Sequence, residues 1–349
     1  MAFAGVLYGV GDIRYEEVKI SEINEREVLI AVKCAGICGS DIPRIKTKGT
    51  YSFPTIPGHE LAGVVSEIGS NVTNVAINDR VTVYPLLSCG QCIYCKEGKD
   101  NLCDNYNYLG SRCDGGFAEF IKCPAENVLK IPDNISFEEA ALVEPMAVAL
   151  RGVKRGKIKL GDTVVVFGLG PIGLFAAKWA KINSASTVVG VDRNNYKLKL
   201  AKEMGGVDYA INLENKHCDS IVEKVIESEA ADIVLECSGA NVFQELAVGV
   251  VKKSGLISMV GNPKGDVLFK EKNFQKILRK EIILVGSWNS LIVSEENEWR
   301  ETLENLASGK IRASPVISHR FKLSEIKEVF DYLHEKKYKN YCKGVFLME

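Results

Sequence analysis

Long hydrophobic runs, an excess of one charge and an export signal are all missing from this 349-residue chain. The longest uncharged apolar stretch, residues 164–177, contains three glycines and a proline and is shorter than the ~20 residues of a membrane-spanning helix. Lys and Arg (44) nearly balance Asp and Glu (45), which disfavours binding to nucleic acid or to an acidic membrane. No basic cluster precedes an apolar segment near Met1, so we expect a cytoplasmic protein without a signal peptide.

Histidine is also scarce, with four in the chain, whereas cysteine is frequent, with eleven. In a long chain without an export signal, clustered cysteines indicate metal binding or core packing rather than disulfide bonds. The positions of the histidines and cysteines are therefore the main indicators of metal binding in this chain.

The sequence pattern changes near residue 150, and the chain is too long for one ordinary core. Before this point apolar and polar residues alternate, as in residues 27–33, which predicts a β-rich domain and a partly open barrel. After it, buried-strand runs alternate with helical patterns, which predicts a parallel, doubly wound sheet in an α/β domain. We expect domains at residues 1–150 and 151–288, and a segment at 289–349 that returns to the first domain.

A glycine-rich segment, Gly168-Leu169-Gly170-Pro171-Ile172-Gly173, matches the G-x-G-x-x-G pattern of dinucleotide sites. It follows an apolar strand and opens a helix, whose free N–H groups would face the pyrophosphate. Asp192, which ends the next strand, would accept hydrogen bonds from the ribose hydroxyls and repel a 2′-phosphate. NAD is therefore expected rather than NADP, although Arg193 weakens this preference. A glycine-rich turn without a ligand is the alternative.

Four cysteines lie close together, as Cys89-x-x-Cys92-x-x-Cys95 followed by Cys103. Four thiolates match a closed tetrahedral zinc site, whose role is structural because no coordination position is left open. Such a zinc would order residues 89–103, which contain few apolar side chains. The alternatives are an iron–sulfur cluster, which no other feature supports, and four free surface thiols, which would oxidise readily.

A catalytic zinc needs about three protein ligands and an open position. The candidate ligands are Cys38, His59, Glu60 and Glu144. Glu144 is a lone acid in an apolar stretch, where a buried carboxylate must be paired or coordinated. Each candidate alone also fits a structural role, such as a core histidine or a solvated acid. Their occurrence beside the four-cysteine loop and the dinucleotide motif favours a catalytic metal site.

Together these motifs resemble those of the zinc-dependent medium-chain dehydrogenases of the alcohol and polyol family, over essentially the whole chain. The segments that carry the resemblance are residues 38–41, 58–60, 89–103, 114–119, 143–145 and 168–173. The resemblance implies a GroES-like catalytic domain, completed by the C-terminal segment, and a Rossmann domain. It also implies two zinc ions per chain, NAD as cofactor and a homodimer or homotetramer.

Residue roles follow from the same resemblance. Cys38 and His59 are implied to be zinc ligands, with Glu144 as the third ligand, a position where alcohol dehydrogenases have cysteine. Glu60 is implied to lie close behind the metal, as a ligand, an exchange partner or a holder of water. Asp41 would orient His59.

The expected reaction is hydride transfer from an alcohol carbon to the nicotinamide, helped by a zinc ion that makes the substrate hydroxyl more acidic. Ser40 would receive the hydroxyl proton. Relatives continue this proton relay with a histidine at the position of Pro43, so the proton is expected to leave here through water.

Shorter segments resemble the galactitol-1-phosphate 5-dehydrogenases, which oxidise galactitol 1-phosphate to tagatose 6-phosphate with NAD. They are residues 38–45, 85–89, 109–112, 277–281 and 286–288. A substrate phosphate needs cations, which Arg44 and Arg112 would supply unless both form salt bridges elsewhere. Sorbitol or L-iditol, butanediol and L-threonine dehydrogenases are alternatives within the family. A non-catalytic NAD-binding redox sensor is the alternative outside it, which the intact set of candidate ligands disfavours.

Overall fold

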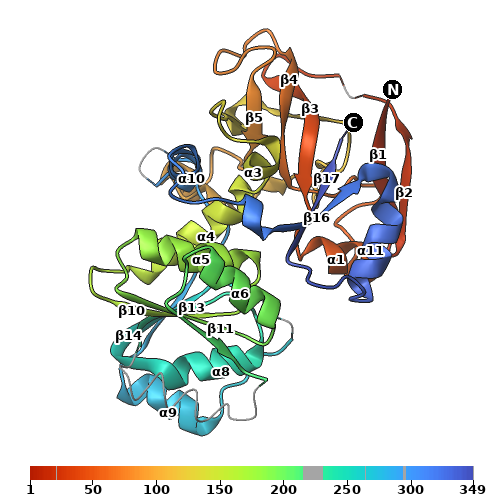
Figure 1. Ribbon diagram of the computed structural model, residues 1–349. Helices are drawn as coiled ribbons and strands as arrows, with labels where there is room; N and C mark the ends of the chain where they lie inside the picture. The colour runs from red at the N-terminus through yellow and green to blue at the C-terminus, as the bar shows by residue number, and fades with distance from the viewer. Residues whose placement is uncertain (21, 215–230, 264, 294–295, 349) are drawn as a thin grey trace. The chain divides into compact units, whose positions relative to one another are not determined.

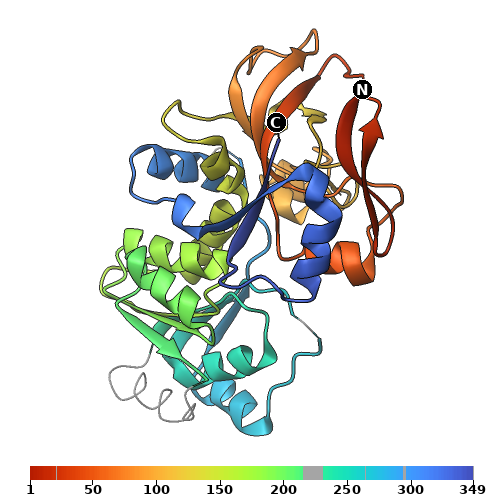
Figure 2. The same cartoon turned by 45° about the vertical axis from the view of Figure 1, so that its right-hand side comes forward.

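The computed structural model describes residues 1–20, 22–214, 231–263, 265–293 and 296–348. The chain forms two compact units (Figures 1 and 2), of which unit 1 comprises Met1–Glu144 and Leu291–Glu349, and unit 2 comprises Pro145–Ser290. The sequence places the corresponding junctions at 150/151 and 288/289. Within the described residues, no helix is both long and apolar enough to cross a lipid bilayer.

A six-stranded parallel sheet forms the centre of unit 2. Its strands are β10 (Thr163–Phe167), β11 (Thr187–Asp192), β12 (Tyr209–Asn212), β13 (Ala231–Glu236), β14 (Val251–Met259) and β15 (Ile283–Gly286). Their order in the sheet is β12-β11-β10-β13-β14-β15. Counted from the first strand this is 3-2-1-4-5-6, the order of dinucleotide-binding sheets, so the predicted Rossmann fold is confirmed.

Helices cover both faces of this sheet (Figure 1), with α5 and α6 on one face and α8 and α9 on the other. The helices are α4 (Val143–Gly156), which begins in unit 1, α5 (Pro171–Ile182), α6 (Asn195–Glu203), α8 (Asn241–Val250) and α9 (Glu271–Arg279). Every residue of β10 is buried, as its continuous apolar run predicts for a central parallel strand. The helical pattern that the sequence suggests between β12 and β13 lies outside the described residues.

Unit 1 is built on a larger sheet with the order β16-β17-β3-β4-β5-β9, and β8 also pairs with β3. These strands are β3 (Glu27–Gly36), β4 (Glu60–Ile68), β5 (Arg80–Val83), β8 (Phe120–Pro124), β9 (Val128–Lys130), β16 (Ile317–Lys322) and β17 (Lys343–Leu347). Two two-stranded antiparallel sheets complete the strands: β1 (Ala2–Gly9) with β2 (Asp12–Val18), and β6 (Leu86–Leu87) with β7 (Asn107–Tyr108). The predicted β-rich character is confirmed.

The strand β17 comes from the C-terminal segment and pairs antiparallel with β3, with Val345 opposite Gly36. Its apolar side chains enter the core of unit 1, where Phe346 packs on Phe117 with 5.1 Å between the ring centroids. Segments more than 200 residues apart in the sequence therefore share one sheet and one core.

Short helices connect the strands of unit 1. They are α1 (Asp41–Pro43), α2 (Ile93–Lys96), α3 (Phe137–Ala141), α10 (Glu298–Ala307) and α11 (Ile326–His334), with 3-10 turns at Asp100–Leu102, Ala125–Asn127, Ser314–Val316 and Leu323–Glu325 and a π turn at Arg44–Lys48. The sequence predicts a strand at residues 315–317, but a 3-10 turn occupies Ser314–Val316 and β16 begins at Ile317. Pro315 explains the difference, because it has no N–H group to donate to a sheet and favours the start of a turn.

Candidate active site

The end of β3 and the start of β4 lie side by side, because Gly36 pairs with Glu60 in the antiparallel register. Cys38, two residues beyond β3, and His59, immediately before β4, are thereby brought to the same end of the sheet. A Cβ atom at Gly36 would lie 2.3 Å from the Glu60 carboxylate, so glycine is required for this close approach.

A cluster of potential metal ligands results from this register. One ligand atom each from Cys38, His59 and Glu60 lies within 4.8 Å of the others. His59 and Glu60 are buried and Cys38 is half-buried. The cluster therefore combines a thiolate, an imidazole and a carboxylate in a largely buried position. This set of donor atoms suits zinc. The residues therefore fit the metal that the sequence motifs predict.

Asp41, the first residue of α1, lies next to this cluster. Its Oδ1 lies 3.5 Å from His59 Nδ1 and 2.6 Å from Arg44 Nη1, and its Oδ2 accepts the Cys38 backbone N–H at 3.0 Å. Burial lowers the pKa of His59, but the neighbouring Asp41 and Cys38 outweigh burial and leave this pKa well above its ordinary value. Because Nδ1 faces Asp41, Nε2 is the ring nitrogen left for a metal.

Glu60 is held by Lys343, a residue that our sequence analysis missed. Lys343 begins β17, and its Nζ donates to Glu60 Oε1 at 2.6 Å and lies 2.5 Å from Oε2. Both side chains are almost fully buried. Burial lowers the pKa of Lys343, but the Glu60 carboxylate outweighs burial and raises it. The sequence signal for this residue is a single cation in an otherwise uncharged strand, Lys343–Leu347.

Glu144 lies in the first turn of α4 and is not part of the three-residue cluster. Its Oε1 accepts a hydrogen bond from the Tyr108 hydroxyl at 3.1 Å. The ring of Tyr108 in turn stands edge-on to the His59 ring, with 5.5 Å between the centroids. Burial raises the pKa of Glu144 to about 7, so a nearby cation would favour its ionised form. Tyr108 was also missed, because a single tyrosine in a two-residue strand gives no distinctive sequence signal.

Ser40 lies against the thiol of Cys38. Its Oγ donates to Cys38 Sγ at 3.2 Å, and the side chain is half-buried. The hydroxyl group is therefore beside the candidate ligands and still open to exchange. Pro43, which stands where relatives have a relay histidine, is the last residue of α1.

The four-cysteine loop is compact, and all four sulfur atoms lie within 4.8 Å of one another. Cys95 Sγ lies 3.4 Å from Cys92 Sγ and 3.9 Å from Cys89 Sγ, close to the ~3.8 Å that four Zn–S bonds of ~2.3 Å at tetrahedral angles require. Backbone N–H groups of Asp104 and Cys95 lower the pKa of Cys92 to about 6, which favours the thiolate that binds zinc. The four residues, Cys103 included, fit a structural zinc.

The two arginines that the sequence suggests for phosphate binding have different surroundings. Arg44 is paired with the buried Asp41. Arg112 is stacked between Tyr51 and Tyr106, with its Cζ 4.4 and 4.3 Å from the ring centroids, and its Nη1 donates to the Tyr106 carbonyl at 3.3 Å. In the part of the chain that the structure describes, no carboxylate pairs with Arg112. Arg112 is therefore the better placed of the two to receive an anion.

The dinucleotide motif of unit 2 joins β10 to α5. Gly168 follows β10 with φ +83°, and Gly170 caps α5, with Pro171 and Ile172 in its first turn. A Cβ atom at Gly173 would lie 1.8 Å from the Gly168 carbonyl oxygen, so the helix and the strand meet only because this residue is glycine.

Asp192, the last residue of β11, supports this turn. Its carboxylate accepts the backbone N–H groups of Leu169 at 2.6 Å and Asn194 at 2.8 Å. Arg193 is exposed beside it. The N-terminus of α5 is thus available to bind a pyrophosphate. The Asp192 carboxylate, at the edge of the motif, is available to accept hydrogen bonds from a ribose.

Comparison with known proteins gives consistent matches along the chain. The alcohol dehydrogenase GroES-like domain matches residues 24–133, and the zinc-binding dehydrogenase family matches residues 171–308. Sorbitol dehydrogenase from Bombyx mori is 34% identical over 338 residues, which cover 94% of each chain.

Solved structures match at a similar level. Galactitol-1-phosphate dehydrogenase from Escherichia coli has a TM-score of 0.93 and 30% identity, covering 99% of this chain and 100% of its own. A zinc-binding dehydrogenase from Sinorhizobium meliloti 1021, solved bound to NADP, has a TM-score of 0.91 and 30% identity, covering 100% and 99%. The predicted family resemblance and two-domain fold are thereby confirmed.

Proposed function

The chain belongs to the zinc-binding medium-chain dehydrogenases, and from this premise we propose that it oxidises a secondary hydroxyl group of a polyol or polyol phosphate with NAD as hydride acceptor. The observation that carries the proposal is the buried cluster of Cys38, His59 and Glu60 with Glu144 linked to it through Tyr108. Galactitol 1-phosphate, oxidised to tagatose 6-phosphate, is the substrate we favour, and sorbitol or L-iditol is the alternative.

We assign the catalytic zinc to Cys38, His59 and Glu144. When bound, the zinc acts as a Lewis acid that makes the substrate hydroxyl more acidic. The charge of Glu60 is already compensated by Lys343, whereas Glu144 accepts a hydrogen bond from a neutral tyrosine. The carboxylate of Glu144 would therefore stabilise a bound zinc dication more than Glu60 would. Glu60 remains behind the site as the partner of Lys343.

The residues around the cluster supply orientation and a proton acceptor. Asp41 faces His59 Nδ1 and would orient the ring with Nε2 toward the metal, and Arg44 pairs with the other side of Asp41. Ser40 Oγ, beside Cys38 Sγ, receives the proton of the substrate hydroxyl. Cys89, Cys92, Cys95 and Cys103 would hold a second zinc, which would order residues 89–103.

NAD is the cofactor we propose, bound by the motif at residues 168–173. Bound NAD would supply the hydride acceptor, and the chain would hold its pyrophosphate at the N-terminus of α5. Asp192 would accept hydrogen bonds from the ribose hydroxyls, and its charge would disfavour a 2′-phosphate. A similar dehydrogenase binds NADP, so this choice depends on residues such as Asp192 rather than on the fold.

Asp192→Ser is expected to lower the preference for NAD over NADP by at least about tenfold, because it removes a negative charge that repels the 2′-phosphate. The ratio of kcat/KM values for the two cofactors measures the effect. Arg193→Ala is the companion variant and should shift the ratio the other way. An unchanged ratio in Asp192→Ser would show that another residue sets the preference.

The substrate proposal is tested by measuring NAD reduction with hexitols beside their 1-phosphates. We expect a higher kcat/KM for galactitol 1-phosphate than for galactitol or sorbitol. Arg112→Gln should raise KM for the phosphorylated substrate by about tenfold or more and leave KM for the free hexitol within about twofold, because only the phosphate uses the guanidinium. A preference of the wild-type protein for unphosphorylated sorbitol would contradict the phosphate proposal and favour the alternative.

We further propose a cytoplasmic homodimer. The ten cysteines within the described residues carry no disulfide bond, which supports a reducing compartment. The strand β15 ends the sheet of unit 2, and Ile283 and Leu284 on it are about half exposed. Phe274 and Leu278 of the neighbouring α9 are exposed as well. Such an apolar sheet edge fits pairing with β15 of a second copy around a twofold axis.

Leu284→Glu is expected to convert the dimer into a monomer, because it places a charge at the proposed twofold interface. Size-exclusion chromatography with light scattering measures the mass. Tyr209→Glu, on the opposite edge strand β12, is the matched control and should remain dimeric. A wild-type monomer, or a Leu284→Glu protein that stays dimeric, would contradict the interface.

A further inference from the structure

Tyr108 lies in the short strand β7, and its backbone is held by several parts of unit 1. Tyr108 pairs with Leu86 of β6, whose carbonyl oxygen also accepts a hydrogen bond from the Asn127 side-chain amide at 2.8 Å. The carbonyl oxygen of Tyr108 accepts the Arg112 backbone N–H at 2.9 Å, which closes a turn directly after the strand. The backbone that carries the tyrosine ring is therefore fixed on both sides.

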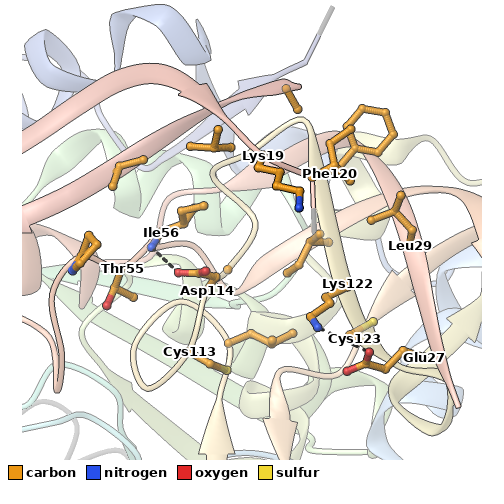
Figure 3. A pocket seen from close by; sticks show the side chains of 18 of the residues that line it. Lys19, Glu27, Leu29, Thr55, Ile56, Cys113, Asp114, Phe120, Lys122 and Cys123 are labelled. Atoms are coloured by element: carbon orange, nitrogen blue, oxygen red, sulfur yellow. Dashed lines mark hydrogen bonds and ion pairs between the residues drawn. The ribbon is translucent and has the colours of Figure 1, made fainter. Parts of the chain in front are cut away.

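The segment that contains Tyr108, residues 108–115, is joined by hydrogen bonds to the segment that ends at His59, residues 56–59. Asp114 Oδ1 accepts the Ile56 backbone N–H at 2.9 Å, a contact that Figure 3 shows at the wall of a cavity in unit 1. The Ile56 carbonyl oxygen accepts the Gly115 backbone N–H at 2.7 Å. The tyrosine and the histidine therefore belong to two segments that are tied to each other.

The side chain of Tyr108 contacts two of the proposed zinc ligands. Its ring stands edge-on to the His59 ring, with 5.5 Å between the centroids, and edge-on to the Tyr106 ring at 6.5 Å. Its hydroxyl donates to Glu144 Oε1 at 3.1 Å. In the part of the chain that the structure describes, no other group donates a hydrogen bond to Glu144, and Oε2 accepts none. One oxygen atom of this carboxylate is therefore left for another partner.

The other buried carboxylate near the cluster, Glu60, is bound in a different way. Lys343 Nζ lies 2.6 Å from its Oε1 and 2.5 Å from its Oε2, so both oxygen atoms face a cation. The phenol of Tyr108, in contrast, is neutral and occupies a single oxygen atom of Glu144. Tyr108 therefore restrains the Glu144 carboxylate without compensating its charge, which remains available to a metal ion.

We propose that Tyr108 is a positioning residue for the third zinc ligand. Its hydroxyl holds Glu144 Oε1 and leaves Oε2 for the metal, and its ring supports the imidazole of His59. The inference rests on the assignment of Glu144 as a ligand in the proposed function, and it adds the residue that determines how tightly this carboxylate binds zinc. Hydrogen-bond partners of metal ligands typically raise metal affinity by about 10–100-fold.

Tyr108→Phe removes the hydroxyl and keeps the ring, so it isolates the hydrogen bond. Competition with a zinc chelator should show one of the two zinc ions bound about 10–100-fold more weakly than in the wild-type protein. The other ion, in the four-cysteine loop, should be unchanged, which also shows that unit 1 is folded. Tyr332→Phe, at an exposed tyrosine of α11, is the matched control and should leave both affinities unchanged.

A spectroscopic measurement separates a positioning role from a merely structural one. The visible absorption of the protein with cobalt(II) at the catalytic site depends on the arrangement of the ligands. This spectrum should shift in Tyr108→Phe and not in Tyr332→Phe. An unshifted spectrum in Tyr108→Phe would show that the hydroxyl does not position the ligands and would overturn the proposal.

Glu144→Gln separates the role of Tyr108 from the ligand assignment. It should weaken the same zinc ion more than Tyr108→Phe does, and adding Tyr108→Phe to it should change the zinc affinity by less than about twofold. Unchanged affinity in Tyr108→Phe beside weakened affinity in Glu144→Gln would overturn the role of Tyr108 and leave the ligand assignment intact. Unchanged affinity in Glu144→Gln would contradict the assignment and with it the inference. An equal effect of Tyr108→Phe in the wild-type and Glu144→Gln backgrounds would overturn the inference, because the hydroxyl would then act through another group.

Discussion

His59→Ala is expected to lower kcat/KM by more than about 10³-fold while leaving NADH binding largely unchanged. The imidazole is one of the proposed zinc ligands and lies in unit 1, whereas the dinucleotide motif lies in unit 2. Without it the metal loses a ligand, and the buried Asp41 loses the ring it faces. The metal content should fall from about two zinc ions per chain to about one, because the four-cysteine loop keeps its own ion.

His334→Ala is the matched control, because His334 is an exposed histidine at the end of α11. It should retain wild-type turnover and about two zinc ions. Turnover is followed by NAD reduction, cofactor binding by NADH fluorescence and zinc by elemental analysis. A His59→Ala protein that keeps more than about a tenth of its activity would contradict the proposed mechanism. One zinc ion in the wild-type protein would remove either the catalytic or the structural assignment.

Lys343→Met should lower the free energy of unfolding by about 3–5 kcal/mol, because it leaves the Glu60 carboxylate buried without its cation. Glu60 and Lys343 are 1% and 3% exposed, so water cannot replace the lost partner. The double variant Glu60→Gln/Lys343→Met should recover much of this loss, since it removes both charges. Urea unfolding of the three proteins, with an unchanged slope, measures the differences.

Lys337→Met serves as the control for Lys343→Met. Lys337 is also paired with a glutamate, Glu335, but both side chains are about half exposed. The unfolding midpoint of the Lys337→Met protein should stay close to the wild-type value, because surface ion pairs contribute little to the free energy of unfolding. If Lys343→Met were as stable as this control, the buried pair would not support the site in the way proposed here.

Local patterns in the sequence predict the features that depend on short stretches of chain. The turn at residues 168–173 is recognisable because Gly168 takes a positive φ and Gly173 packs against the Gly168 carbonyl oxygen, and Asp192 is recognisable because it ends the next strand. The four-cysteine loop is recognisable because its ligands are close in sequence. The six strands of unit 2 are likewise visible as separate apolar runs.

Features that depend on distant pairing were not predicted. Lys343 contacts Glu60 because β17 and β4 lie on either side of β3. The pairing register of segments so far apart in the chain cannot be recognised from the residues near either one. Tyr108 meets His59 and Glu144 for a similar reason. In the sequence, Arg44 and Arg112 are equivalent candidate cations. In the structure, Arg44 forms an ion pair with Asp41, and Arg112 is stacked between two tyrosines. Such differences arise from packing, which a residue pattern does not contain.

The ion pair between Glu60 and Lys343 also bears on how the chain matures during synthesis. The two residues are 283 positions apart, so at ~5–20 residues per second a ribosome needs roughly 15–60 s to reach the lysine after the glutamate. Throughout that interval β3 lacks its neighbour β17, and Glu60 lacks its cation. The nascent chain therefore cannot complete this part of unit 1 until all of unit 2 has been made, and we expect unit 2 to be the first of the two to fold.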